Sequence, residues 1–207
     1  MKKRLLILAV IFFVFSPMLY SCKQDNNNSE KCIDFIKNIK SYKCDAVITL
    51  LNDRQNLEYN CKQFFKKDLG GRIDLEKDRI LLYKDDKIYI NDKNSGFKYT
   101  IDRDFDTIFR MSLVGEYIHL MYTNEEIKKS LKNIDGLEYQ IVELDIPGMN
   151  RNISRGKMYI NTKDCLPEKL ILYDGSNKEK ATIKYKQFTA NLELEDKLFD
   201  VGKKGGE

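Results

Sequence analysis

The segment GGRIDLEKDRILLYKDDKIYINDKNSGFKYTI, residues 70–101, decides the fold class of this chain. It contains four short runs rich in Ile, Leu, Tyr and Thr: Arg72–Glu76, Arg79–Tyr83, Lys87–Asn91 and Phe97–Ile101. Polar turn residues separate these runs by only a few positions. Strands joined by such short connections pair with their neighbours along the chain. The segment therefore predicts an antiparallel meander.

More strands are predicted on both sides of the meander. Before it lie Tyr42–Leu51 and Leu57–Phe65, and after it Leu137–Ile146, Lys157–Asn161, Lys169–Asp174 and Lys180–Phe188. In the last run, apolar residues alternate with Thr and Lys, which indicates a strand with one buried face and one exposed face. The chain is thus predominantly a sheet protein.

Helical spacing of apolar residues interrupts the strands twice. It predicts a helix over Ser29–Lys40 with Ser29 as N-cap, and a longer one over Asp104–Tyr122 with Asp104 or Asp106 as N-cap. A short third helix is predicted from Thr123 or Asn124 to Asp135-Gly136, because acidic residues early in the segment and lysines later complement the helix dipole. The broad apolar face of the second helix suits a helix lying in the hollow of a curved sheet. Four C-terminal residues, Leu192, Leu194, Leu198 and Phe199, are expected to pin the end of the chain.

The N-terminal segment Met1–Cys22 has the parts of an export signal. Three cations at positions 2–4 precede the unbroken apolar run Leu5–Phe15, which is short for a membrane-spanning helix. The ending Leu19-Tyr20-Ser21-Cys22 resembles a bacterial lipobox, although Tyr20 departs from the small residue usual there. The resemblance implies that Cys22 is lipidated and becomes the first mature residue. An ordinary signal peptide cut near Ser21 and an uncleaved anchor are the alternatives.

These features divide the chain into four parts. They are a lipoprotein signal peptide (1–21), a polar tether (22–28), one folded domain (29–200) and a disordered tail (201–207). Two acyl chains on Cys22 would give stable anchoring, so the domain is expected on the outer side of the cytoplasmic or forespore membrane. ATP is scarce there, and no cofactor is expected.

The charge balance argues against nucleic acid as a partner. The formal charge of +4 includes the three cations of the signal, and the remaining chain has 33 basic and 32 acidic residues. Such a balance provides no electrostatic footprint for a phosphate backbone.

Four cysteines follow Cys22: Cys32, Cys44, Cys61 and Cys165. An exported chain with an even number of cysteines permits two disulfides, in three connectivities. A turn at Asn52-Asp53 would place Cys44 opposite Cys61 and allow a bridge between them. Buried free thiols, which pack like small apolar groups, are the favoured alternative. No Cys-x-x-Cys spacing occurs, so no metal site is expected.

No residue pattern indicates catalysis. The single histidine, His119, lies in the middle of a predicted helix, where a core or rim position is expected. Neither a phosphate-binding loop nor a nucleophile elbow occurs in the sequence. Tyr89, Tyr99 and Tyr159 could form a platform for a sugar or peptide, although packing is the commoner role of such strand residues. The prediction is a protein that is not an enzyme.

Several segments resemble a known family of lipoproteins. They are Ile39-Lys40-Ser41-Tyr42 and the strand and turn motifs at 146–150, 158–161, 166–174 and 178–185. The order of elements is similar to the LolA/LolB-like lipoprotein fold, an α+β fold. It is a strongly curved antiparallel sheet, an incomplete barrel, with helices covering the concave side. The motifs resemble those of the clostridial GerS-like spore-germination lipoproteins.

The resemblance implies a role in spore germination. Proteins of this kind bind and support a cortex-modifying N-acetylmuramoyl-L-alanine amidase, which permits muramic-lactam formation in cortex peptidoglycan. The alternative function is an extracytoplasmic carrier or sensor of acyl chains or lipoproteins.

A cell-wall amidase is therefore the expected protein partner, and it is expected to bind at a sheet edge. An edge strand is a template for strand addition. The terminal strands Tyr42–Leu51 and Lys180–Phe188 are the predicted edges. Pairing of the same edges in two copies makes a homodimer the second expectation.

Overall fold

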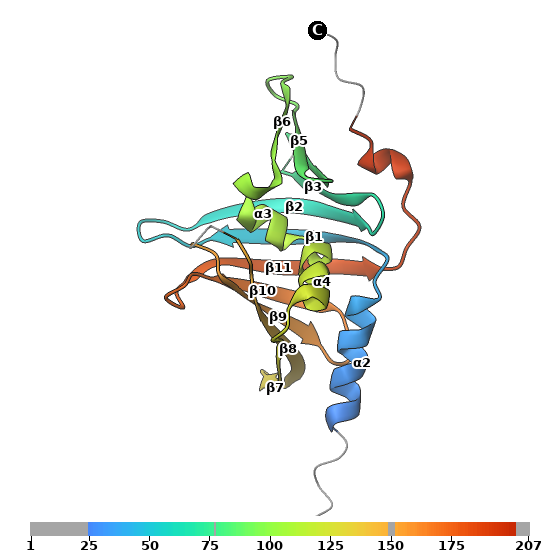
Figure 1. Ribbon diagram of the computed structural model, residues 1–207, viewed down its shortest axis with the longest axis vertical. Coiled ribbons are helices and arrows are strands. Elements are labelled where there is room, and N and C mark those ends of the chain that lie inside the picture. Colours follow the sequence, from blue (N-terminus) through green and yellow to red (C-terminus); the bar gives the residue numbers. More distant parts are fainter. Residues whose placement is uncertain (1–24, 77, 149–151, 202–207) are drawn as a thin grey trace, which may run out of the picture.

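Eleven antiparallel strands form one open sheet in the computed structural model, which describes residues 25–76, 78–148 and 152–201 (Figure 1). The strands are β1 Ser41–Leu50, β2 Leu57–Lys66, β3 Gly70–Leu75, β4 Arg79–Lys84, β5 Lys87–Asp92, β6 Lys98–Asp102, β7 Lys128–Ile134, β8 Leu137–Asp145, β9 Arg155–Asn161, β10 Pro167–Tyr173 and β11 Glu179–Ala190. The helices are α2 Asp25–Lys37, η2 Arg103–Phe105, α3 Thr107–Ser112, α4 Val114–Thr123 and η3 Asp196–Phe199. The predicted meander and α+β class are confirmed.

The strand order places the two ends of the folded chain in the middle of the sheet. It runs β6-β5-β4-β3-β2-β1-β11-β10-β9-β8-β7, and β1 pairs with β11 from Tyr42↔Ala190 to Leu50↔Ala181. The prediction that Tyr42–Leu51 and Lys180–Phe188 form the edges is therefore wrong. Because the last strand returns to pair with the first, the edges are β6 and β7, from the middle of the sequence.

The third predicted helix is also wrong, because its residues form the edge strand β7. Asp135 and Gly136 have φ angles of 52° and 81° and join β7 to β8, with Ile134 opposite Leu137. Two consecutive positive φ angles suit the tight turn of a hairpin, and Asp-Gly is a favoured sequence for it. The lysines of this segment, which resemble a helix C-terminus, lie along the exposed strand instead.

The long helix predicted over Asp104–Tyr122 is broken at Leu113, whose ψ of 119° is extended. Asp106 caps α3 as predicted, accepting a hydrogen bond from the Phe109 N–H at 3.1 Å. Two buried tyrosines of the sheet satisfy backbone groups at the break. The Tyr42 hydroxyl accepts from the Val114 N–H at 2.9 Å, and the Tyr185 hydroxyl donates to the Ser112 carbonyl at 2.8 Å. The sheet thus fixes where the helix bends.

Helix α2 begins at Asp25 and ends at Lys37, earlier at both ends than predicted. Its first four residues belong to the segment predicted to be a polar tether, and Ser29 lies inside the helix rather than at its N-cap. The buried side chains Cys32, Ile33 and Ile36 form its apolar side, in agreement with the predicted spacing. The described part of the helix therefore reaches to within three positions of Cys22.

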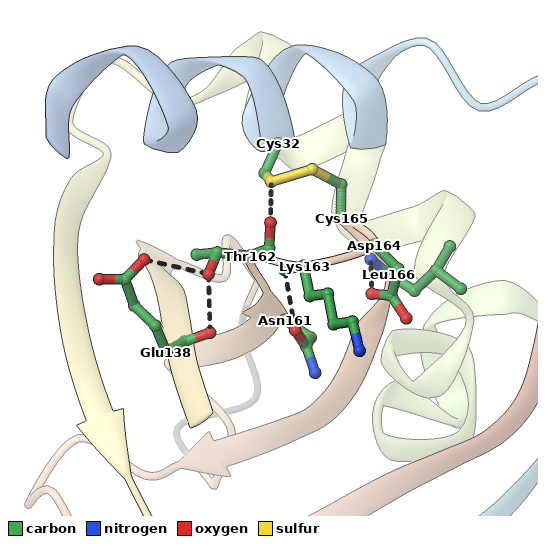
Figure 2. The surroundings of a disulfide bond; sticks show 8 residues. All are labelled: Cys32, Glu138, Asn161, Thr162, Lys163, Asp164, Cys165 and Leu166. Atoms are coloured by element: carbon green, nitrogen blue, oxygen red, sulfur yellow. Dashed lines mark hydrogen bonds between the residues drawn. A yellow bond between two sulfur atoms is a disulfide. The ribbon is translucent and has the colours of Figure 1, made fainter. Parts of the chain in front are cut away.

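A disulfide joins Cys32 of α2 to Cys165, in the loop between β9 and β10 (Figure 2). The Cα atoms are 4.7 Å apart, and 133 positions separate the two residues in the sequence. Cys165 has a φ of 59°, and its N–H donates to the Asn161 carbonyl at 2.8 Å. The loop is thus folded tightly around the half-cystine that holds α2 to the sheet.

Cys44 and Cys61 are free and buried, so the Cys44–Cys61 bridge is not formed and the alternative of buried thiols is correct. Cys44 pairs with Gln63, and Ala46 pairs with Cys61. The two thiols are diagonal neighbours because the loop from residue 51 to 56 is centred one position later than predicted. Directly opposite residues lie nearer to each other than diagonal ones.

The helices and the C-terminal segment cover opposite faces of the sheet. We call the face that packs against α3 and α4 the inner face; its cluster includes Ile48, Ile88, Leu113 and Ile183, all fully buried. On the other face, Leu82 packs with a C-terminal group comprising Leu192, Leu194, Leu198 and Phe199. The prediction that these four residues pin the C-terminal segment is confirmed.

Candidate partner-binding edge

Strand β6 is one of the two edges of the sheet, and one row of its backbone groups has no partner strand in the described part of the chain. The Phe97 carbonyl accepts from the Asp92 N–H at 2.9 Å, and the Arg103 N–H donates to the Asp86 carbonyl at 3.1 Å. Residues that face the neighbouring strand alternate along an antiparallel pair. The N–H and C=O groups of Lys98, Thr100 and Asp102 therefore point away from β5, as a template for another strand.

Exposed aromatic side chains surround this edge. Phe97 is 71% exposed, Tyr99 47% and Phe105 79%, and they are three of the eight large apolar side chains that are exposed in the described residues. Tyr99 lies opposite Ile90, which belongs to the inner-face core. Exposed aromatic residues are enriched at interaction surfaces. We call β6 with Phe97 and Phe105 the aromatic edge.

Arg103 holds the end of the aromatic edge in place. Its guanidinium pairs with Glu116 of α4 and donates to the Asp85 carbonyl at 2.9 Å. Lys87 of β5 also pairs with Asp102, the last residue of β6. The strand end is therefore joined to α4 and to the turn between β4 and β5, which limits its freedom before any partner binds.

A buried carboxyl group lies next to this anchor. Burial raises the pKa of Asp106, while the Phe109 N–H and the Tyr83 hydroxyl, 3.4 Å from Oδ2, act in the opposite direction by hydrogen bonding. The pKa of Tyr83 is raised well above its ordinary value, chiefly by burial. Through these hydrogen bonds Asp106 and Tyr83 hold the start of α3.

The opposite edge, β7, has a different chemical character. Lys128, Lys129 and Lys132 are all exposed on this seven-residue strand. Charged residues, lysine above all, protect an edge strand from pairing with another chain. The aromatic edge is therefore the one of the two that is suited to a partner.

Two open grooves flank α4. One has a volume of about 870 Å³ and is lined by Phe105, Met111, His119 and Ile146, among others. The other, about 580 Å³, is lined by Phe65, Tyr83, Ile118 and Tyr122, among others, and also touches His119. His119 is exposed at the rim of both grooves, which agrees with the rim position expected for it.

Between the grooves, α4 packs directly on the sheet. A Cβ atom at Gly115 would lie 2.2 Å from the Phe65 ring, so only glycine permits this approach. The fully buried Tyr117 hydroxyl lies 2.9 Å from the carbonyl oxygens of Val142 and Gly156. The apolar residues of α3 and α4 thus fill the inner face at this level, as the sequence predicted.

The structure describes three of the four other candidate site residues, the tyrosines, and Cys22 lies outside the described residues. Tyr89 packs with the C-terminal group of Leu192, Leu194, Leu198 and Phe199. Tyr159 is buried, and the Lys169 ammonium lies 4.1 Å from the centroid of its ring. Of the three tyrosines considered as a platform, only Tyr99 is exposed. Sequence reasoning missed the aromatic edge because it assigned Phe105 to a buried helix face and placed the sheet edges elsewhere.

Among the described residues, no three His, Cys, Asp or Glu side chains are grouped so as to hold a metal ion. None of the helices that the structure describes is long and apolar enough to span a bilayer.

Residues 2–199 match the family of YdcC-like sporulation proteins. The chain belongs to this family. No curated protein matches the sequence. Family membership therefore places the chain among sporulation proteins.

Solved structures share the fold at low sequence identity. One is an outer-membrane lipoprotein-sorting protein domain from Vibrio parahaemolyticus, which is 8% identical to this chain in sequence and superposes with a TM-score of 0.51. The alignment covers 84% of this chain and 95% of that domain. The LolA superfamily protein NE2245 from Nitrosomonas europaea is 12% identical (TM-score 0.44; 83% and 97% covered). The complex of the CwlD amidase with the GerS lipoprotein from Clostridioides difficile contains a similar chain, 19% identical (TM-score 0.42; 81% and 96% covered). At this identity the likeness to the Vibrio domain shows the fold alone, and it agrees with the open antiparallel sheet that the sequence predicted.

Proposed function

We propose that this family member is a lipoprotein that acts in sporulation and germination by binding a cell-wall amidase through its aromatic edge. The observation that carries the proposal is the outer side of β6, which has no partner strand in the described residues, together with the exposed Phe97, Tyr99 and Phe105. An added strand would satisfy the outward backbone groups, and its alternate side chains would cover the aromatic rings. The protein would act by contact and not by chemistry.

The choice of an amidase rests on family and sequence pattern. The YdcC-like family is a family of sporulation proteins, and the strand and turn motifs resemble those of GerS-like lipoproteins. In C. difficile, GerS is in complex with the CwlD amidase. By this analogy the partner is an N-acetylmuramoyl-L-alanine amidase, whose activity would permit muramic-lactam formation in the cortex.

A location outside the cytoplasm has two supports. The leader ends in a lipobox-like Leu19-Tyr20-Ser21-Cys22, and the folded domain contains the Cys32–Cys165 disulfide. Disulfides persist mainly in oxidising compartments outside the cytoplasm. We infer anchoring through a lipid on Cys22 on the outer side of the cytoplasmic or forespore membrane.

The binding site is tested with a matched pair of charge substitutions. Tyr99→Lys and Leu137→Lys alter side chains of nearly equal exposure, 47% and 46%, one on the aromatic edge and one at the start of β8. We expect Tyr99→Lys to weaken amidase binding by about tenfold or more, as loss of an interface anchor does. Leu137→Lys should leave the dissociation constant, measured by calorimetry, unchanged. Equal effects of the two substitutions, or no complex with any sporulation amidase, would refute the proposal.

Lipidation is tested separately. Cys22→Ala should leave the folded domain intact and release it from the membrane fraction of sporulating cells. Recovery of the variant with the membranes to the same extent as the wild type would show that Cys22 is not the anchor.

The carrier function receives less support from the inner face. Gly115 of α4 lies directly against the Phe65 ring, so no acyl chain fits between the helix and the sheet at this contact. A carrier would have to use the open groove of about 580 Å³ beside it. Copurification of native lipid with the intact protein, detected by mass spectrometry, would favour the carrier. The homodimer was predicted through Tyr42–Leu51 and Lys180–Phe188, which lie in the middle of the sheet, so self-pairing would have to use β6 instead. Sedimentation of the protein without amidase would detect it.

A further inference from the structure

The start of α2 lies very close in sequence to the proposed lipid anchor. Only Lys23 and Gln24 separate Cys22 from Asp25, the first residue of α2 that the structure describes. Three residue steps span at most about 10 Å between Cα atoms even when fully extended. If Cys22 carries the lipid, the helix must begin at the membrane surface.

A rigid connection continues from this point into the sheet. Cys32 is seven positions along α2 from Asp25, which corresponds to about 10 Å of helix. The disulfide attaches Cys32 to Cys165, and Thr162 of the same loop donates its N–H to the Glu138 carbonyl at 3.0 Å. Figure 2 shows Cys32, Cys165, Thr162 and Glu138 gathered in one place. The anchor-proximal helix, the β9–β10 loop and the start of β8 therefore move as one unit.

This unit lies at one end of the molecule. In Figure 1 the N-terminal end of α2 and strand β7 are near the bottom of the long axis, while β6 is near the top. Leu137, the first residue of β8 and directly after the Asp135-Gly136 turn, is 46% exposed at the anchor end. We call the β7–β8 turn together with the β9–β10 loop Thr162–Leu166 the anchor-end surface.

We propose that the anchor-end surface rests on the phospholipid bilayer and that the aromatic edge consequently faces away from the membrane. The inference rests on the proposed lipidation of Cys22. The short connection allows the domain to tilt, but it limits Cys32 to about 20 Å from the lipidated Cα, by adding the two lengths above. An amidase would then meet β6 on the side remote from the bilayer, where the lipid surface does not obstruct strand addition.

The absence of tryptophan from the sequence permits a direct test. Leu137→Trp places a single donor on the anchor-end surface, and Phe97→Trp places one on the aromatic edge. The oxidised chain from residue 22 onward is coupled through Cys22 to maleimide lipids in phosphatidylcholine vesicles that also contain dansyl-headgroup lipid. Cys44 and Cys61 are buried, and Cys32 and Cys165 are bridged, so coupling is confined to Cys22.

We expect energy transfer to dansyl to be several-fold more efficient from the Leu137→Trp variant than from the Phe97→Trp variant. Insertion of a Gly-Ser segment of about 20 residues before Asp25 allows a separation of about 25 Å, so it should reduce that difference. Equal transfer from the two variants, or more from Phe97→Trp, would overturn the proposed orientation. A difference that the insertion leaves unchanged would overturn the role of the short connection. Because the coupling is chemical, these outcomes are independent of whether cells lipidate Cys22.

Discussion

Loss of the Cys32–Cys165 disulfide should destabilise the domain mainly by expanding its unfolded state. The bridge closes a loop of 133 residues, for which the chain-entropy relation gives about 5 kcal/mol at 25 °C. Measured effects commonly reach only about 2–4 kcal/mol, because real unfolded chains retain structure. Ile33 and Ile36 are buried residues of α2 whose packing does not depend on the bridge. Burial of each side chain contributes roughly 1.5–3 kcal/mol to the docking of the helix. We therefore expect the reduced protein to fold, with α2 still docked.

The measurement is urea unfolding of the oxidised wild type and of the same protein under a strong reductant. With a urea slope of about 2 kcal/mol/M, the expected loss lowers the midpoint by about 1–2 M. The slope itself should increase, since an unlinked chain exposes more surface on unfolding. Cys32→Ala/Cys165→Ala should have the lower midpoint with or without reductant. Cys44→Ala/Cys61→Ala is the control, and it should retain the sensitivity to reductant.

Two results would refute this reasoning. An oxidised wild type whose midpoint does not respond to reductant would mean that the bridge is absent or contributes nothing. A fall in the midpoint together with loss of helical signal before the main transition would mean that the bridge holds α2 in place. The effect would then lie in the native state rather than in the unfolded chain.

Three further predictions concern the core. Leu113→Ala, at a fully buried residue, should lower the free energy of unfolding by about 2–5 kcal/mol in urea titrations, whereas Phe109→Ala, at a half-buried one, should cost less. Gly115→Ala should also destabilise the domain, because overpacking against Phe65 costs about 1–3 kcal/mol and helix propensity returns only about 1. Burial raises the pKa of Cys61 from 9.0 to about 12 and that of Cys44 well above its ordinary value. In a Cys22→Ala chain, neither of these thiols should therefore react with a disulfide reagent at pH 8 until the protein unfolds. The stability that Cys61 contributes is complete below pH 9 and should be lost as the pH rises toward 12, because the unfolded state releases the proton first; urea midpoints across this range measure the loss.

Strand positions could be predicted from the sequence because they depend on local patterns. In Lys180–Phe188, the alternation of buried Ala181 and Ile183 with exposed Lys184 is a property of the strand itself. The same holds for the cap at Asp106, which needs only the neighbouring Phe109 N–H. The segment before the Asp135-Gly136 turn is the exception. Its lysines resembled a helix end, although Asp-Gly followed by a strand pattern already indicated a hairpin.

Long-range relations could not be predicted, because no local pattern encodes them. The pairing of β1 with β11 depends on how eleven strands are ordered in space, and it alone decides which strands become edges. The partner of Cys32 likewise depends on the loop that carries Cys165 in a left-handed conformation. Four cysteines permitted three connectivities, and the structure contains one bridge with two free thiols.

The two edges are consecutive strands of the sequence, yet they lie at opposite ends of the sheet. The connection between them, η2 with α3 and α4, therefore has to cross the inner face, and Leu113 and Tyr117 bury it there. Arg103, the first residue of this connection, is also the residue that joins the end of β6 to Glu116 of α4. The segment that fills the inner face is thus the same one that holds the aromatic edge in position. A substitution that loosens α4 should therefore weaken partner binding as well as stability, even though α4 contributes nothing to the β6 backbone.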